Sequence, residues 1–335
     1  MVFLALCAAL CTGLAAIITA EVADRAGGPL AISRWRSLTA ACVLAGAATL
    51  VGHAIGLGHR YMPAVAGSSL AAAVVGEFCL NKAYRDLGAR RAALLFAGAA
   101  PFSVLVGWLF LGEAPSLAQL GGIALVVAGL VLAIWFSPLH RGQGARHNES
   151  VASIVAIIGG LCAGLAQALG NVMARSALRD GADPVAVMTF RAIVAAFAFW
   201  GISMMLRAAG RQERLTPPRS VLAAVILSAC LSFALGNTLL MVALKSGQTA
   251  IVTTFAATTP VMLLPLMWWR SGRCPSPLAW AGAALTVAGI ACIAMAPMRG
   301  AVAAVPPHGD ALTAPGISAP AAPATQVARL SHPDR

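Results

Sequence analysis

Glu77 is the only carboxylate well inside one of the long apolar stretches of this sequence, and the amide Asn81 follows it four residues on. On a helix, residues at i and i+4 share a face. Ionisable groups at membrane depth are costly, so each is a candidate functional group. Glu77 is therefore a candidate site for a proton or a substrate ammonium group. The alternative, equally open, is a structural Glu77 paired with Lys82 or with an arginine of a neighbouring helix.

Two arginines, Arg36 and Arg191, stand at matching positions, each seven residues after a proline, Pro29 and Pro184. Each lies about one turn into an apolar stretch. Such a side chain either pairs with a substrate carboxylate or extends to the membrane interface. The second interpretation is favoured, because a long side chain reaches the interface at low cost.

Neutral polar side chains lie at similar depth, and amides and hydroxyls there either bond neighbouring helices or line polar cavities. Gln167 and Asn171 share one helix face at i and i+4, and Asn237 and Thr238 are adjacent in another stretch. The candidate substrate- or ion-binding residues are therefore Glu77, Asn81, Gln167, Asn171, Asn237, Thr238, Arg36 and Arg191.

Motifs for catalysis or metal binding are missing from the sequence. It contains no C-x-x-C, H-E-x-x-H or G-x-S-x-G pattern, and seven of its eight cysteines lie in apolar stretches, where cysteine acts as a small hydrophobe. We expect no catalytic residues, no metal site and no cofactor.

The composition places the chain in a lipid bilayer. Hydrophobic residues make up 59% of its 335 residues and charged residues only 10%, against about 25% charged in soluble domains. The net charge of +12 comes from cations scattered between apolar stretches, which suits membrane topology and not nucleic-acid binding. The expected partners are the bilayer and a small-molecule substrate, and a homodimer is left open.

Ten stretches are long and apolar enough for helices that cross the membrane, which takes about 20 residues. Strands are not expected, because these runs are too long for the strands of a membrane barrel. The ten predicted spans are 2–20, 33–53, 63–80, 92–111, 117–136, 151–174, 184–206, 221–244, 249–269 and 278–296.

The sequence repeats itself. Residues 101–129 return as 260–289, each an apolar helix, a Gly-x-x-Pro-Ser turn and the first part of a second helix, in which Val-Ala-Gly recurs. A Gly-to-Pro interval of thirteen residues also recurs, at 88–101 and 247–260. Five helices thus pair with five, and an odd number inverts the second copy in the membrane, an arrangement typical of alternating access. The predicted fold is all-α, an integral membrane protein of ten helices in two inverted five-helix repeats.

The predicted organisation has four parts. Residues 1–136 form the first repeat, 137–150 a short polar linker, and 151–297 the second repeat. Residues 298–335 are rich in Ala and Pro without an apolar period, and we expect them to be disordered. The substrate cavity should lie between the halves, near the midplane, lined by helices three, four, eight and nine.

These features resemble the drug/metabolite transporter superfamily, in particular its ten-helix EamA-type members, over roughly residues 2–297. The paired halves, the Pro–Arg and Gly–Pro spacings, and Leu111-Gly112-Glu113 carry the resemblance. It implies a secondary transporter of small metabolites, often an exporter of amino acids or related compounds. We expect the protein to export such compounds, or drugs, across the inner (cell) membrane by alternating access, with the proton gradient as the first choice of driving force. The alternatives are a facilitator, a lipid-linked sugar flippase, a non-transporting membrane subunit or a membrane enzyme.

Overall fold

The described part of the chain is almost entirely helical. A computed structural model describes residues 2–51, 57–111, 114–135, 149–211, 216–239, 242, 259–271 and 276–296, and none of these forms a β-strand. The described helices all belong to one unit, Met1–Gly300. Outside the described residues lie nearly all of the predicted linker, the first part of the predicted ninth span (residues 249–258), the Gly-Glu and Gly-Arg turns, and the predicted tail.

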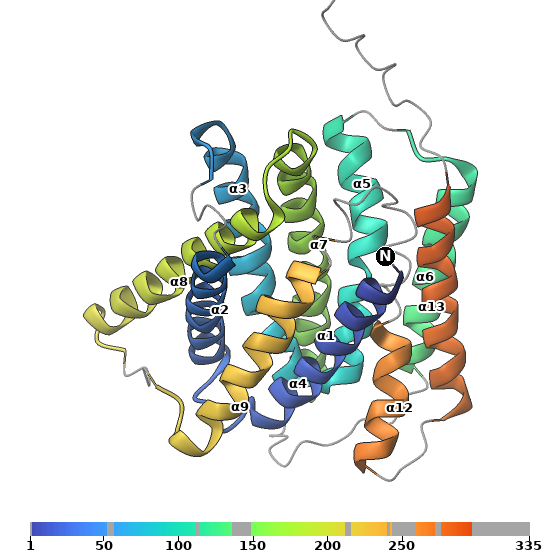
Figure 1. The fold of residues 1–335 in the computed structure, drawn as a ribbon. Helices are drawn as coiled ribbons and strands as arrows, with labels where there is room; N and C mark the ends of the chain where they lie inside the picture. The colour runs from blue at the N-terminus through green and yellow to red at the C-terminus, as the bar shows by residue number, and fades with distance from the viewer. Residues whose placement is uncertain are drawn as a thin grey trace, which may run out of the picture. The chain divides into compact units, whose positions relative to one another are not determined.

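The described residues of the first half form six α-helices and two short helices. Figure 1 shows how the α-helices are arranged. They are α1 (Val2–Val22), α2 (Pro29–Val51), the 3₁₀-helix η1 (His59–Tyr61), α3 (Met62–Ser68), the π-helix η2 (Ser69–Gly76), α4 (Glu77–Ala97), α5 (Ala99–Leu111) and α6 (Leu117–Trp135). The described helices of the second half are α7 (Glu149–Arg179), α8 (Pro184–Ala208), α9 (Arg219–Ala229), the π-helix η3 (Cys230–Gly236), α12 (Thr259–Ser271) and α13 (Pro277–Met295).

Among the described residues, five helical stretches are long and apolar enough to cross a membrane. They are His59–Phe110, Ile154–Arg175, Pro184–Ala208, Arg219–Leu239 and Pro277–Met295, with shorter apolar helices at Leu6–Val22 and Leu117–Leu132. The first stretch is divided at Gly88, whose φ of 79° and ψ of 167° are not helical. Glycine adopts this conformation without the steric cost that other residues meet. The break falls between the predicted third and fourth spans.

Several helices begin at the prolines and serines identified in the sequence. α2 and α8 both begin on a proline, Pro29 and Pro184, a residue that suits the first helical position because its missing N–H needs no partner there. The serines of the two Pro-Ser turns cap helices: Ser116 and Gln119 cap the start of α6 reciprocally, and Ser276 accepts from the backbone N–H of Ala279 in α13.

Helices α6 and α13 cross at their glycines and run antiparallel (Figure 1). A Cβ added to Gly122 would lie 2.7 Å from the carbonyl oxygen of Gly289, and one added to Gly129 would lie 2.7 Å from that of Gly282. The two contacts pair the helices in opposite sequence order. Since the repeat matches Gly122 with Gly282 and Gly129 with Gly289, equivalent residues of the halves make equivalent contacts.

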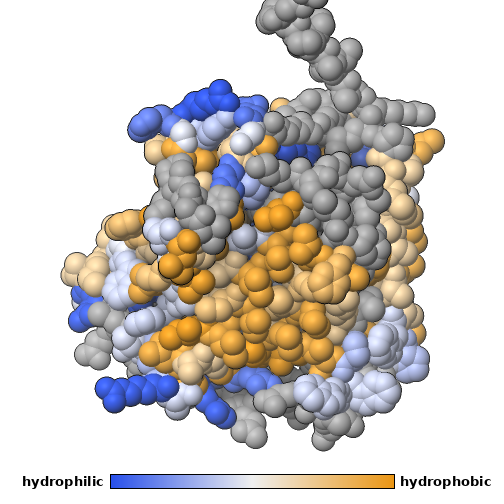
Figure 2. Space-filling view, in the orientation of Figure 1, coloured by the Kyte–Doolittle hydropathy of each residue, from blue (hydrophilic) through white to orange (hydrophobic). Residues whose placement is uncertain are grey.

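The surface matches the composition. Large apolar side chains are exposed, among them Phe110 at 71% and Trp269 at 86%. On the face shown in Figure 2 apolar residues form a broad band, and hydrophilic ones gather toward its upper and lower edges. Apolar surface on this scale is suited to lipid and not to water.

Candidate functional site

A buried ion pair joins α2 to α4. Arg36 Nε lies 2.8 Å from Glu77 Oε1, and the two side chains are only 4% and 11% exposed. Buried charges occur in proteins when they are paired and hydrogen-bonded. The pair places the carboxylate that the sequence singled out against one of the two candidate arginines.

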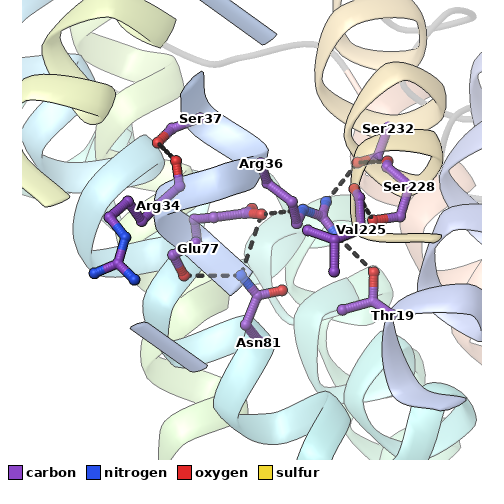
Figure 3. A network of polar contacts seen from close by, with 10 residues as sticks. Thr19, Arg34, Arg36, Ser37, Glu77, Asn81, Val225, Ser228 and Ser232 are labelled. Atoms are coloured by element: carbon purple, nitrogen blue, oxygen red, sulfur yellow. Dashed lines mark hydrogen bonds and ion pairs between the residues drawn. The ribbon is translucent and has the colours of Figure 1, made fainter. Parts of the chain in front are cut away.

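The rest of the Arg36 guanidinium donates to hydroxyl groups from two other helices (Figure 3). Nη1 donates to Thr19 Oγ1 of α1 at 2.6 Å, and Nη2 donates to Ser232 Oγ of η3 at 2.5 Å. Ser232 in turn donates to the backbone oxygen of Ser228 at 2.9 Å. The network therefore ties α1, α2 and α4 of the first half to η3 of the second.

Asn81 joins the network from one turn further along α4. Its Nδ2 lies 3.3 Å from Glu77 Oε1 and 2.9 Å from Ser33 Oγ of α2. Its Oδ1 is buried and accepts no hydrogen bond from the residues that the structure describes. The helix face shared by Glu77 and Asn81 is confirmed, and Asn81 orients the carboxylate toward Arg36.

The π-helix η2 sets the position of Glu77, which is the first residue after it. Ser68 donates to the backbone oxygen of Gly170 in α7, and Ser69 donates to that of Arg191 in α8, both at 2.7 Å. The segment before Glu77 is thereby anchored to two helices of the second half. Short π-helical segments occur frequently at functional sites.

Two expectations about partners need correction. Lys82 does not pair with Glu77; it forms a half-exposed pair with Asp86 at 2.9 Å, one turn along α4. Arg36 and Arg191 do not extend to the membrane interface, since each residue is only 3% exposed. Both side chains are enclosed by neighbouring helices, and the ion pair with Glu77 gives Arg36 a partner inside the protein. Of the two partners expected for a paired Glu77, Lys82 and an arginine of a neighbouring helix, the structure shows the arginine.

The other candidates lie elsewhere on the scaffold. Gln167 Nε2 donates to Asn171 Oδ1 at 3.0 Å on α7, as their spacing predicts. Asn237 and Thr238 directly follow η3 and are half-buried, and Thr238 Oγ1 has no partner among the described residues. No hydrogen bond or ion pair within the described ranges joins these four residues to the Arg36 network.

Sequence reasoning missed Arg34, which is fully buried. Its Nη1 donates to Ser203 Oγ of α8 at 2.5 Å, and its guanidinium lies 5.3 Å from the ring centroid of Trp200. Two residues along a helix correspond to about 200°, so Arg34 and Arg36 leave α2 on opposite sides, as Figure 3 shows. The hydroxyl partners Thr19, Ser33 and Ser232 were also missed, because serine and threonine are common in apolar helices and carry no distinguishing pattern.

An all-helical chain with two related halves, lipid-compatible surface and a buried polar network between its helices has the architecture of a multi-pass membrane transporter. The family model of the EamA-like transporter family matches residues 1–135 and 154–295. The chain belongs to this family, and it is therefore a transporter of the drug/metabolite transporter type and not an enzyme.

A solved structure supports the fold. One described only as "Crystal structure of protein" superposes with a TM-score of 0.62 at 17% sequence identity, covering 88% of this chain and 94% of that one. No curated protein matches the sequence.

Proposed function

We propose that the chain is a secondary transporter that exports small metabolites, amino acids or related compounds, across the inner (cell) membrane by alternating access with proton coupling. The observation that carries the proposal is the buried Arg36–Glu77 pair, which also hydrogen-bonds Ser232 of the other half. A charge pair at this depth is expensive to maintain and is typical of ion and substrate pathways.

The geometry supports a coupling scheme at Glu77. A proton on Glu77 removes the negative charge that faces Arg36, and Arg36 also donates to Ser232 across the two halves. Protonation of Glu77 therefore weakens the ion pair of Arg36, the residue whose guanidinium also holds α2 against η3. Protonation at one membrane face and release at the other would alter the contact between the halves in each cycle. This is the simplest way for a proton gradient to drive alternating access.

The test is accumulation of candidate substrates in inside-out vesicles, with and without an imposed pH gradient. The wild-type protein should accumulate at least one amino acid or related metabolite only when the gradient is present. Glu77→Gln keeps the side-chain shape and removes the carboxylate charge. It should insert, lose accumulation against a gradient, and retain exchange of substrate down its gradient.

The matched control is Asp86→Asn, which removes a carboxylate from a half-exposed ion pair on the same helix. It should behave as wild type. Transport by Glu77→Gln that equals wild type across the pH range would show that Glu77 is structural. Wild-type vesicles that accumulate none of the panel, with or without the gradient, would contradict the proposed export.

A further inference from the structure

Arg191 is a buried cation with almost no partners among the residues that the structure describes. It lies in α8, only 3% exposed, and its Nε has no hydrogen-bond partner within those residues. Its Nη1 lies 4.0 Å from the thioether sulfur of Met188, a weak acceptor, and no carboxylate of the described chain pairs with it. An ionised group left buried without a counter-charge is strongly unfavourable. Its presence in a folded protein calls for an anion from outside the described chain.

The repeat shows which anion is missing, because the two halves can be set in register. The π-helices η2 and η3 end on Gly76 and Gly236. A Cβ on Gly76 would contact Ala163 of α7, and one on Gly236 would contact Thr12 of α1. The match of Thr12-Gly13 with Ala163-Gly164 in the sequence is thus reproduced by equivalent packing in space.

In this register, none of the three positions that correspond to the partners of Arg36 carries a carboxylate or a hydroxyl group. Glu77 corresponds to the neutral Asn237, Thr19 corresponds to Gly170, and Ser232 corresponds to Ala72. Gly170 and Ala72 are in close contact, just as Thr19 and Ser232 converge on Arg36. Arg191 therefore matches Arg36 as a buried cation, while the positions that match the carboxylate and hydroxyl partners of Arg36 carry neither group.

We infer that Arg191 binds the carboxylate group of the transported substrate, which takes the place that Glu77 holds opposite Arg36. The inference rests on the proposed function and narrows its substrate class to small carboxylates, amino acids included. The guanidinium matches a carboxylate with two parallel hydrogen bonds. One unpaired cation balances one negative charge, which favours a carboxylate over a phosphate monoester of nearly two charges. Cationic drugs without a carboxylate are excluded from this site.

The experiment measures binding directly, through thermal unfolding of the purified full chain. The probes are the protein amino acids and short monocarboxylates, each compared with its own amide, which has the same shape without the charge. A ligand that binds the folded state raises the unfolding temperature. At least one acid should stabilise the wild-type protein, and the matching amide should not.

Substitutions at Arg191 then separate a binding role from a folding role. Arg191→Gln should bind the acid roughly 30-fold more weakly or worse, the loss expected when one partner of a buried charged pair is removed. Without ligand its unfolding temperature should equal or exceed that of wild type, because an unpaired charge has been removed. Arg191→Lys should retain part of the affinity. The control Arg211→Gln, at an exposed position after α8, should bind as wild type.

Three results would overturn the inference: acid and amide binding equally, no acid stabilising the wild type, or Arg191→Gln binding the acid as wild type does. These are distinct from failure of the proposed function. If Arg191→Gln retains gradient-driven accumulation of the same substrate, the result supports export and contradicts substrate binding by Arg191. If the wild-type protein binds the acid but accumulates nothing, the result supports the binding site and contradicts export.

Discussion

At the scale of residues, the two arginines that the repeat places in equivalent positions have different surroundings. Arg36 has a carboxylate and two hydroxyl partners, whereas Arg191 has a distant sulfur. Both are buried, so the difference lies in the partners and not in the depth. The divergence separates a cation paired with a carboxylate inside the protein from one that has no carboxylate partner among the described residues.

The Arg36–Glu77 pair should show strong coupling in a double-mutant cycle. Removing one partner leaves the other charge buried, so Arg36→Gln and Glu77→Gln should each destabilise the fold by about 3–5 kcal/mol. The double variant should lose much less than the two single losses combined. The measurement is reversible unfolding in detergent.

The same cycle on Lys82 and Asp86, which are 39% and 27% exposed, provides the comparison. A solvent-accessible pair on a helix should couple by no more than about 1 kcal/mol. Additive losses at Arg36 and Glu77, equal to those of this exposed pair, would show that the buried pair is not the centre of the network.

At the scale of elements, the helices are placed by their ends and their close contacts. Prolines start α2 and α8, serines cap α6 and α13, and Gly88 breaks the long apolar stretch between two predicted spans. The π-helix η2 then turns Glu77 toward α2. Each feature is local, yet together they decide which side chains meet.

The crossing of α6 and α13 predicts a sharp difference between neighbouring glycines. Gly122→Ala places a methyl group 2.7 Å from the carbonyl oxygen of Gly289, so the helices must separate. We expect a destabilisation of about 1–3 kcal/mol, the usual cost of overpacking. Gly121→Ala meets nothing within 4 Å and should be neutral or stabilising by up to about 1 kcal/mol, through helix propensity. Thermal unfolding of the two variants checks this, and equal effects would contradict the close crossing.

At the scale of the whole molecule, the antiparallel contact of α6 with α13 is what an inverted repeat produces. Helices that occupy the same place in two copies run in opposite directions only if one copy is turned over. The described residues show this relation for the last helix of each half. Ten membrane spans and the four-part organisation remain predictions, because residues 243–258 and the segments between and after the halves lie outside the described chain.

The inversion predicts that α6 and α13 begin on opposite faces of the membrane. In a background with the eight natural cysteines replaced, Leu117→Cys and Leu278→Cys provide exposed labels near the two helix starts. A membrane-impermeant maleimide applied to right-side-out and inside-out vesicles should label one position in each preparation. Labelling of both positions from the same side would rule out the inverted arrangement.

The sequence by itself determined the class of protein, the helical character and the internal repeat, because apolar composition, helix punctuation and spacing are local properties of the chain. It also identified Glu77, Asn81 and both arginines, since charged and amide groups in apolar stretches are conspicuous. Only the tertiary structure decided that Arg36 pairs with Glu77, that Lys82 pairs with Asp86, and that Arg34 points to the opposite side of α2 from Arg36. Which partner a buried charge finds depends on side chains up to about 200 residues away, such as Ser232, and on the packing that excludes water from them. No spacing in the sequence encodes that choice.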